Sequence, residues 1–409
     1  MSKTARDSAS TVEVPAKRYK FTIDADIPFL PYEMYHIMAQ YYSKDLTEQM
    51  DFLEAISNSD ELQFSSVTKL FSLEHTADIT DAQWMNYKPL LTSSPNNLKI
   101  TKFTKDTREL QRILISCPNL TTLTFKVARF NDCYFIVFPT GLTTLHLDFF
   151  GAKTIAYSMF SYIFADTPKL SNLYLSNFNG SVNDLKLPSN LRILNFGDYF
   201  DYPVNELVLP SNLSHLEFGN AFNQPVDKLV FPSFLIHLKF GDAFDQPVDK
   251  LVLPSNLKYL EFGDAFNHPV DQLVFPPKLT KFRFGNAFDQ PVDKLVLPSN
   301  LLHLEFGDAF DHPVNELGFP LNLEYLKFGN NFNQDVDVDK VVFPPNLLYL
   351  KFGNGFNPPI NDVVLPPNLQ TIEFGDAYAE CVYKHHYGDI LIPKTVTNFT
   401  LGYVTFKFV

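Results

Sequence analysis

One repeating unit decides the fold of this chain. Residues 213–234 read LSHLEFGNAFNQPVDKLVFPSF, and residues 235–256 repeat them as LIHLKFGDAFDQPVDKLVLPSN. A unit of this length cannot close a hydrophobic core alone, so it has to stack on its neighbours. The repetition therefore predicts a solenoid. The Phe before Gly marks the register at Phe196, Phe218, Phe240, Phe262, Phe284, Phe306 and Phe328, and, after a two-residue insertion, at Phe352 and Phe374.

The start of each unit has the pattern of a β-strand. In residues 213–218, Leu216 and Phe218 alternate with the polar His215 and Glu217. Because successive side chains of a strand point to opposite faces, we expect the two apolar side chains inside and the two polar ones outside. The Gly that follows supplies backbone freedom at a corner, and the later Pro fixes the next bend.

The repeat also resembles a known family. Its core Leu-x-x-Leu-x-Phe-Gly resembles leucine-rich repeats, and the block Phe222-Asn223-Gln224-Pro225-Val226 resembles the FNIP repeat of amoebae and their giant viruses. The resemblance extends over roughly residues 170 to 402. It implies a mainly β fold, a leucine-rich-repeat-like parallel β-solenoid of 22-residue FNIP repeats, here with a small α-helical N-terminal domain.

The chain before the repeats has a different pattern. From Ile27 to about Leu73 it becomes helical in periodicity, with Met34, Ile37 and Met38 on one apolar face. We expect five segments: a disordered tail at 1–22, the helical domain at 23–75, a connection and N-terminal cap at 76–117, the solenoid at 118–402, and a C-terminal cap strand at 403–409.

The helical segment looks like the opening of an F-box, which many FNIP-repeat proteins carry before their repeats. That resemblance implies an SCF-type ubiquitin ligase, in which the helices bind the F-box adaptor subunit of a cullin complex and the solenoid holds the protein substrate. The alternative is a helical cap on a repeat scaffold without a ubiquitin role. The residues that the resemblance assigns to adaptor binding are Leu30, Pro31, Glu33, Met34, Ile37 and Met38.

Two rows of outward residues follow from stacking the predicted strands. The residue before each Phe alternates in charge over most turns, which favours a self-neutralising ladder over a charged ligand site. Two positions earlier the residues are mostly aromatic, which is typical of protein contact surfaces, although a solvated row without a partner is the alternative. The charged row is Glu217, Lys239, Glu261, Arg283, Glu305, Lys327, Lys351 and Glu373. The expected partner-binding face is His215, His237, Tyr259, Lys281, His303, Tyr325 and Tyr349.

Composition narrows the classes of partner. A net charge of −13 among 409 residues argues against nucleic acid, whose phosphates it would repel. The N-terminal stretch has no apolar secretion signal and no later run reaches the ~18 apolar residues of a membrane span. We therefore expect no membrane partner and a cytoplasmic location, in the host cell if the protein is viral.

The sequence favours a binding protein over an enzyme. No nucleophile, base or phosphate-binding motif departs from the repeat, so we expect no catalytic residues and no cofactor, and a polysaccharide-active solenoid enzyme is the less favoured alternative. The stacked carboxylates of Asp227, Asp249, Asp271 and Asp293 could collect calcium, but hydrogen bonds within the turns are their commoner use. We expect no metal site.

Overall fold

The computed structural model describes residues 10–13, 20–23, 76–77, 97–100, 111, 114–115, 117–126, 137–149, 164, 167–183, 185–334, 341–358, 364–385 and 392–408. The chain divides into two compact units, Met1–Leu173 and Tyr174–Val409. Residues 24–75, which contain the six residues that the F-box resemblance assigns to adaptor binding, lie outside the described residues.

The described part of the first unit consists of short strands. β1 (Ser10–Glu13) pairs antiparallel with β2 (Lys20–Ile23), within and just beyond the stretch expected as a tail. A separate set of parallel strands pairs in the order of the chain. Its buried Leu123 and Leu145 stand where the repeat has its buried Leu, although the rest of the repeat pattern is degenerate here. It comprises β3 (Thr76–Ala77), β4 (Asn97–Ile100), β5 (Thr122–Lys126) and β6 (Thr144–Asp148).

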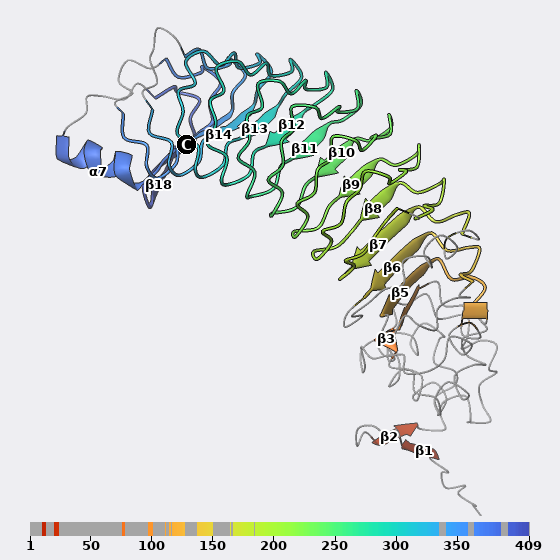
Figure 1. The fold of residues 1–409 in the computed structure, drawn as a ribbon. Coiled ribbons are helices and arrows are strands. Elements are labelled where there is room, and N and C mark those ends of the chain that lie inside the picture. The colour runs from red at the N-terminus through yellow and green to blue at the C-terminus, as the bar shows by residue number, and fades with distance from the viewer. Residues whose placement is uncertain are drawn as a thin grey trace, which may run out of the picture. The chain divides into compact units, whose positions relative to one another are not determined.

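The second unit carries the regular repeats, and its strands stand side by side in chain order (Figure 1). Each strand from β8 to β16 pairs parallel with the next one, and β18 returns antiparallel to β17. The parallel β-solenoid predicted from the repeat is confirmed. After β7 (Asn172–Ser176), which spans the division between the units, the strands are β8 (Ile193–Asn195), β9 (His215–Glu217), β10 (His237–Lys239), β11 (Tyr259–Glu261), β12 (Lys281–Arg283), β13 (His303–Glu305), β14 (Tyr325–Lys327), β15 (Tyr349–Lys351), β16 (Thr371–Phe374), β17 (Asn398–Leu401) and β18 (Val404–Lys407).

Two Phe side chains per turn build the core. Phe218 and Phe222 stack with their ring centroids 4.2 Å apart inside one turn. Each also stacks on its counterpart in the next turn, Phe218 on Phe240 at 5.6 Å and Phe222 on Phe244 at 6.1 Å. All four side chains are buried. The many Phe residues of the sequence therefore form a continuous aromatic core, which no single turn could bury alone.

The Asn or Asp after the second Phe forms a ladder of its own. The side-chain oxygen Oδ1 of Asp201 accepts the backbone N–H of Asn223 at 3.0 Å, and Oδ1 of Asn223 accepts the N–H of Asp245 at 3.0 Å. The pattern continues to Asn357, which donates its N–H to Asn333. Only a short side chain with an oxygen acceptor can reach the next turn in this way, which explains the Asn and Asp at this position.

The Gly after the first Phe is needed for space. A Cβ placed on Gly219 would lie 1.5 Å from the carbonyl oxygen of Gly197. Among the glycines of the described repeats in the second unit, Gly197 has a positive φ of 76°, whereas Gly219 does not. The expectation that Gly219 serves backbone freedom is wrong: neighbouring turns approach so closely that no side chain fits between them.

The last repeats depart from the pattern at α7 (Asp376–His385). This helix replaces the FNIP block after Phe374 and begins with Asp376, an acidic residue that suits a helix N-terminus. Its Tyr378 is buried and stacks 4.4 Å from Phe374, much as Phe356 stacks 4.2 Å from Phe352 in the previous turn. The aromatic core thus continues although the backbone changes from turn to helix. In the portion of the chain that the structure describes, no helix has the length and hydrophobicity to cross a membrane.

Candidate protein-binding face

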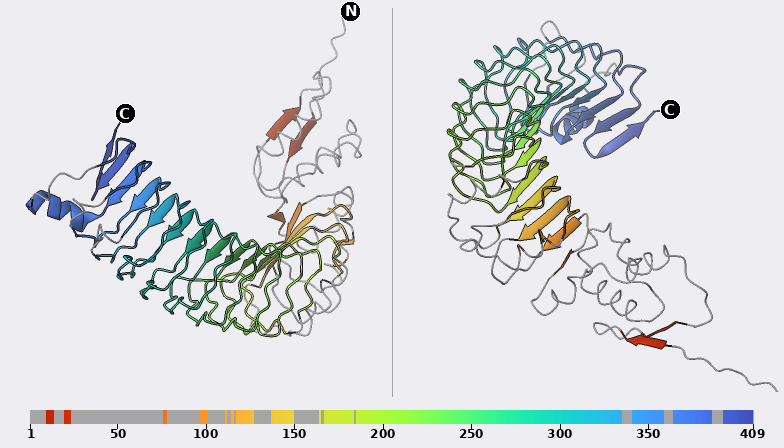
Figure 2. Two further views of the ribbon diagram at one scale, coloured as in Figure 1. Left: turned by 90° about the horizontal axis from the view of Figure 1, so that it is seen from above. Right: turned by 90° about the vertical axis from the view of Figure 1, so that its right-hand side faces the viewer.

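The strands of the second unit lie together on one side of it, and the turns form the other side (Figure 2). In each of the strands β9 to β15 the middle Leu or Phe is buried, while the first and third residues point away from the core. We call the surface made by these outward residues the strand face. Its first residues are the aromatic row predicted as partner-binding, and its third residues are the charged row.

The aromatic row starts with a stack of three rings. The rings of His215 and His237 lie 5.4 Å apart, and those of His237 and Tyr259 lie 4.2 Å apart. The ammonium of Lys281 then lies 5.6 Å from the centre of the Tyr259 ring, a cation–π contact that ends the stack. Burial and the neighbouring imidazole of His237 lower the pKa of His215, so this imidazole is neutral at neutral pH.

A second stack follows on the next three strands. The rings of His303 and Tyr325 lie 3.9 Å apart, and those of Tyr325 and Tyr349 lie 4.3 Å apart. Burial, followed by the carboxylate of Glu373, raises the pKa of Tyr349. Burial, with the carboxylate of Glu305 as the next cause, raises that of Tyr325. Both hydroxyls therefore remain protonated and keep a proton to donate.

The charged row is a ladder of paired charges. Glu261, only 7% exposed, lies between Lys239 and Arg283, whose nitrogens are 3.2 and 3.1 Å from its Oε1. It also accepts a hydrogen bond from the hydroxyl of Tyr259. Further along, Lys351 lies 3.1 Å from Glu373. The alternating charges are thus paired within the chain, which agrees with the predicted self-neutralising ladder.

Three basic side chains lie close to the carboxylate of Glu305. His303 Nε2 lies 2.5 Å from its Oε1, Lys327 Nζ 3.5 Å from its Oε2, and Arg283 Nε 3.8 Å from the same oxygen. The hydrogen bond with His303, aided by the charges of the three neighbours, lowers the pKa of Glu305 to about 2. The side chain is therefore a fixed acceptor at any physiological pH.

The aspartates considered for calcium lie away from the strand face. Asp227, Asp249, Asp271 and Asp293 are exposed at the corner that follows the FNIP block. Across the residues that the structure describes, no group of three or more His, Cys, Asp or Glu side chains is placed to hold a metal ion.

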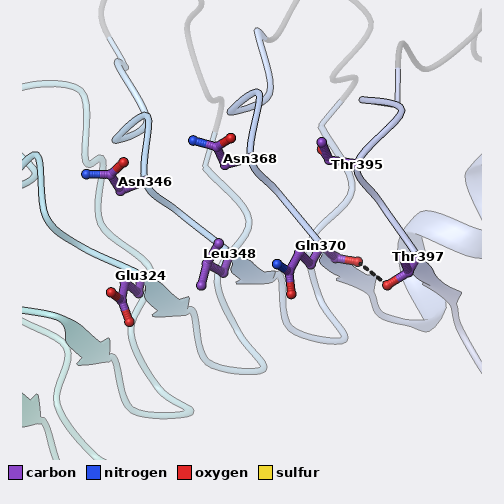
Figure 3. A pocket seen from close by; sticks show the side chains of 7 residues that line it. All are labelled: Glu324, Asn346, Leu348, Asn368, Gln370, Thr395 and Thr397. Atoms are coloured by element: carbon purple, nitrogen blue, oxygen red, sulfur yellow. Dashed lines mark hydrogen bonds between the residues drawn. The ribbon is translucent and has the colours of Figure 1, made fainter.

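A pocket of about 580 Å³ opens beside the C-terminal strands (Figure 3). Its lining comes from four successive turns, and we call it the C-terminal pocket. Four of its side chains donate hydrogen bonds to the turn before: Asn346 Nδ2 to Leu321 O at 3.2 Å, Asn368 Nδ2 to Pro345 O at 3.0 Å, Thr395 Oγ1 to Pro367 O at 2.8 Å, and Thr397 Oγ1 to Gln370 O at 3.4 Å. The pocket is lined by Glu324, Asn346, Leu348, Asn368, Gln370, Thr395 and Thr397.

Sequence reasoning located the rows of the strand face but missed the pocket. The seven predicted face residues, from His215 to Tyr349, lie in one register along seven strands. Whether a partner binds them stays a prediction. The pocket contains no residue singled out from the sequence. The position before each Leu-x-x-Leu is Asn in most repeats, including Asn346 and Asn368, so it gave no signal of the pocket.

The repeats match a known family of repeats. The FNIP Repeat family matches residues 178–221, 222–265, 266–309, 310–355 and 337–377 in tandem, which confirms the predicted FNIP resemblance over these residues. No curated protein matches the chain by sequence.

Several solved structures are similar to the chain. A circular leucine-rich-repeat protein of a giant virus is similar with a TM-score of 0.58 and 29% sequence identity, over 80% of this chain and 48% of that one. The chain thus spans about half the length of that protein. An internalin of Listeria monocytogenes has a TM-score of 0.46 and 15% identity over 92% of this chain and 98% of its own. The Toll–Spätzle complex of Drosophila has a TM-score of 0.48 and 12% sequence identity, over 77% of this chain and 48% of that chain.

Proposed function

Residues 178–377 consist of FNIP repeats, and from that premise we propose that the solenoid is a scaffold that binds another protein on the strand face. One observation carries the proposal. The aromatic row keeps one register over seven strands, from His215 on β9 to Tyr349 on β15, and its half-buried rings form two stacks of three on either side of Lys281.

The order of these side chains suits them to binding. Stacking holds each ring by its neighbours before a partner arrives, so binding costs little additional side-chain entropy. Tyr and His combine an apolar ring with a polar edge, as residues of protein contact surfaces do. Since the charged row is paired within the chain, we expect the partner to be recognised mainly through ring contacts and hydrogen bonds.

The test compares the strand face with the opposite part of each turn. In the full chain, Tyr325→Ser with Tyr349→Ser removes two rings, and Val252→Ser with Val274→Ser changes two side chains that are 80% exposed outside the sheet. Proteins cross-linked and recovered from the cells that naturally make the chain should be lost with the Tyr pair and retained with the Val pair. Melting temperatures of both variants confirm that they are folded. Equal recovery by both would refute the strand face as the binding surface.

For the N-terminal segment we propose the role that its sequence suggests, an F-box that joins the solenoid to a cullin ubiquitin ligase. The support is the motif Leu30-Pro31-Tyr32-Glu33 with the apolar Ile37, placed before a binding solenoid. A substrate held on the strand face would then be presented for ubiquitin transfer. The competing role, a helical cap, needs the same apolar side chains to face the solenoid.

Adaptor binding is tested on the full chain. Leu30→Ala with Pro31→Ala should abolish co-purification with the F-box adaptor subunit, whereas Gln49→Ala, at a polar residue outside the six assigned to adaptor binding, should leave it intact. Recovery of the strand-face partner should not change in either variant. If adaptor recovery survives the double substitution, or never occurs, the ubiquitin-ligase role is rejected and the scaffold role remains.

The same proposal includes no catalytic activity and a cytoplasmic place of action. Solenoids with a uniform repeat serve mostly as binding surfaces, because catalysis needs a local constellation that departs from the repeat. Fractionation of cells that make the chain, with detection by antibody, tests the location. Recovery in a membrane or secreted fraction would reject it.

A further inference from the structure

The C-terminal pocket contains a carboxylate without a cation. Glu324 is exposed in the pocket, and among the residues described by the structure no Lys, Arg or His lies within ion-pair distance of it. The glutamates of the charged row differ, since Glu261, Glu305 and Glu373 each have a basic partner. The pocket is lined by no basic side chain. Its electrostatic potential therefore favours a positively charged ligand.

The pocket also presents amide oxygens. Asn346 and Asn368 use their Nδ2 groups to bind the preceding turn. Within the described ranges, no protein group donates a hydrogen bond to Oδ1 of either side chain. The two amides stand at the same position of successive repeats, so their oxygens form a short row of hydrogen-bond acceptors beside Glu324.

An earlier turn of the same ladder already holds a cation. Asn256 stands at the position of Asn346, and its Nδ2 likewise donates to the preceding turn, to Ser233 O at 2.8 Å. Its Oδ1 accepts a hydrogen bond from Nζ of Lys278, one repeat later, at 2.7 Å. This amide row can therefore bind an ammonium group. In the C-terminal pocket the residue one repeat after Asn346 is Asn368, as in most repeats, so no lysine of the chain stands at the place from which Lys278 reaches Asn256.

From this comparison we propose that the C-terminal pocket binds one Lys or Arg side chain of the protein partner. The cationic head takes the place that Lys278 fills in the earlier turn, with Glu324 as its counter-charge. Leu348, which lies in the same lining, contacts the aliphatic stem. The inference rests on the proposed function, because it names a chemical feature of the partner that the adjacent strand face binds.

Small probes test the pocket without knowledge of the partner. The full chain, labelled with ¹³C in its Leu methyl groups, is titrated with N-acetyl-arginine-N-methylamide, with the lysine analogue, and with the glutamine analogue as the uncharged control. The methyl signals of Leu348, assigned from a Leu348→Ile variant, should shift saturably with either basic probe and not with the glutamine probe. Affinity should be in the millimolar range and fall with added salt, as for an exposed ion pair.

Three variants make the test specific. Glu324→Gln should weaken the basic probes about two- to fivefold, whereas Glu316→Gln, at an exposed carboxylate outside the pocket, should not. Asn368→Lys restores the internal lysine of the earlier turn, so its own ammonium should occupy Asn346 and abolish probe binding. The proposal is overturned if Leu348 fails to shift, if the glutamine probe shifts it equally, or if Asn368→Lys binds the probes as the wild type does.

Partner recovery distinguishes this inference from the function on which it rests. If the Tyr325 and Tyr349 substitutions abolish recovery while Glu324→Gln and Asn368→Lys leave both recovery and probe binding unchanged, the strand face stands and the pocket proposal fails. If no substitution on the strand face alters recovery, the proposed function fails, and the probe titration still decides whether the pocket binds a cation.

Discussion

Phe266 illustrates what a single residue contributes to a repeat that cannot close its own core. Its ring is fully buried and stacks 6.1 Å from both Phe244 and Phe288. Phe266→Ala should lower the free energy of unfolding by about 3–5 kcal/mol, because it leaves a cavity between two turns. Urea denaturation measures this loss, with Val274→Ala, 80% exposed, as the control. A similar loss in both variants would contradict the buried ladder.

Two glycines differ in whether the space around them admits a side chain. A Cβ on Gly263 would lie 1.8 Å from the carbonyl oxygen of Gly241, whereas a Cβ on Gly318 meets nothing within 4 Å. Gly263→Ala should therefore destabilise by about 1–3 kcal/mol, since the turns would have to move apart. Gly318→Ala should be neutral or stabilise by up to about 1 kcal/mol. Thermal unfolding measures the stability of the two variants. A Gly263→Ala variant as stable as the wild type would refute the close approach of the turns.

Glu305 should make the stability of the fold decrease at acidic pH. Folding lowers the pKa of its carboxyl from the ordinary value of 4.5 to about 2, mainly through the hydrogen bond with His303. A carboxylate with a lowered pKa contributes stability that is fully present above pH 4.5 and is lost as the pH falls towards 2. The stability difference between wild type and Glu305→Gln, measured by urea denaturation, should shrink from pH 6 to pH 3. A difference independent of pH would contradict the pairing.

At the scale of the strands, the charged row couples one repeat to the next. Arg283 on β12 lies between Glu261 on β11 and Glu305 on β13. Arg283→Glu should lower the free energy of unfolding by about 1–2 kcal/mol, because two attractive cross-strand pairs become repulsive. Added salt should recover part of the loss. Arg283→Gln removes the attraction without adding repulsion. Its free energy of unfolding should therefore fall less than that of Arg283→Glu and should change less with added salt.

The strands were predictable from the sequence, and the departures from the repeat were not. In β9 the alternation of Leu216 with His215 and Glu217 is local and determines which side chains are buried. The helix α7 begins where Asp376 follows Phe374-Gly375 as in other turns, and the segment then departs from the repeat, with Tyr378 for the second Phe, Ala379 for the Asn or Asp, and Cys381 for the Pro. The stacked rings and the C-terminal pocket depend on distances between turns, which one repeat does not reveal.

At the scale of the whole molecule, the chain combines two kinds of surface. The repeats of the second unit keep one register over many turns, so any property of one outward position extends along the strand face. Most charges on that face are paired within the chain, which leaves the aromatic row as the contact surface that we propose. Glu324 and the amides near the C-terminal end supply a charged point at which the partner's orientation can be fixed.

Site-specific cross-linking tests most directly whether the strand face binds the partner. A photo-reactive phenylalanine is placed at Tyr325 on the strand face or, in a second sample, at Val252, 80% exposed outside the sheet. Both chains are irradiated in the cells that naturally make the protein, and covalent adducts are identified by mass spectrometry. The account predicts one recurring protein adduct from position 325 and none of that protein from position 252. The same adduct from both positions, or from position 252 alone, would contradict it.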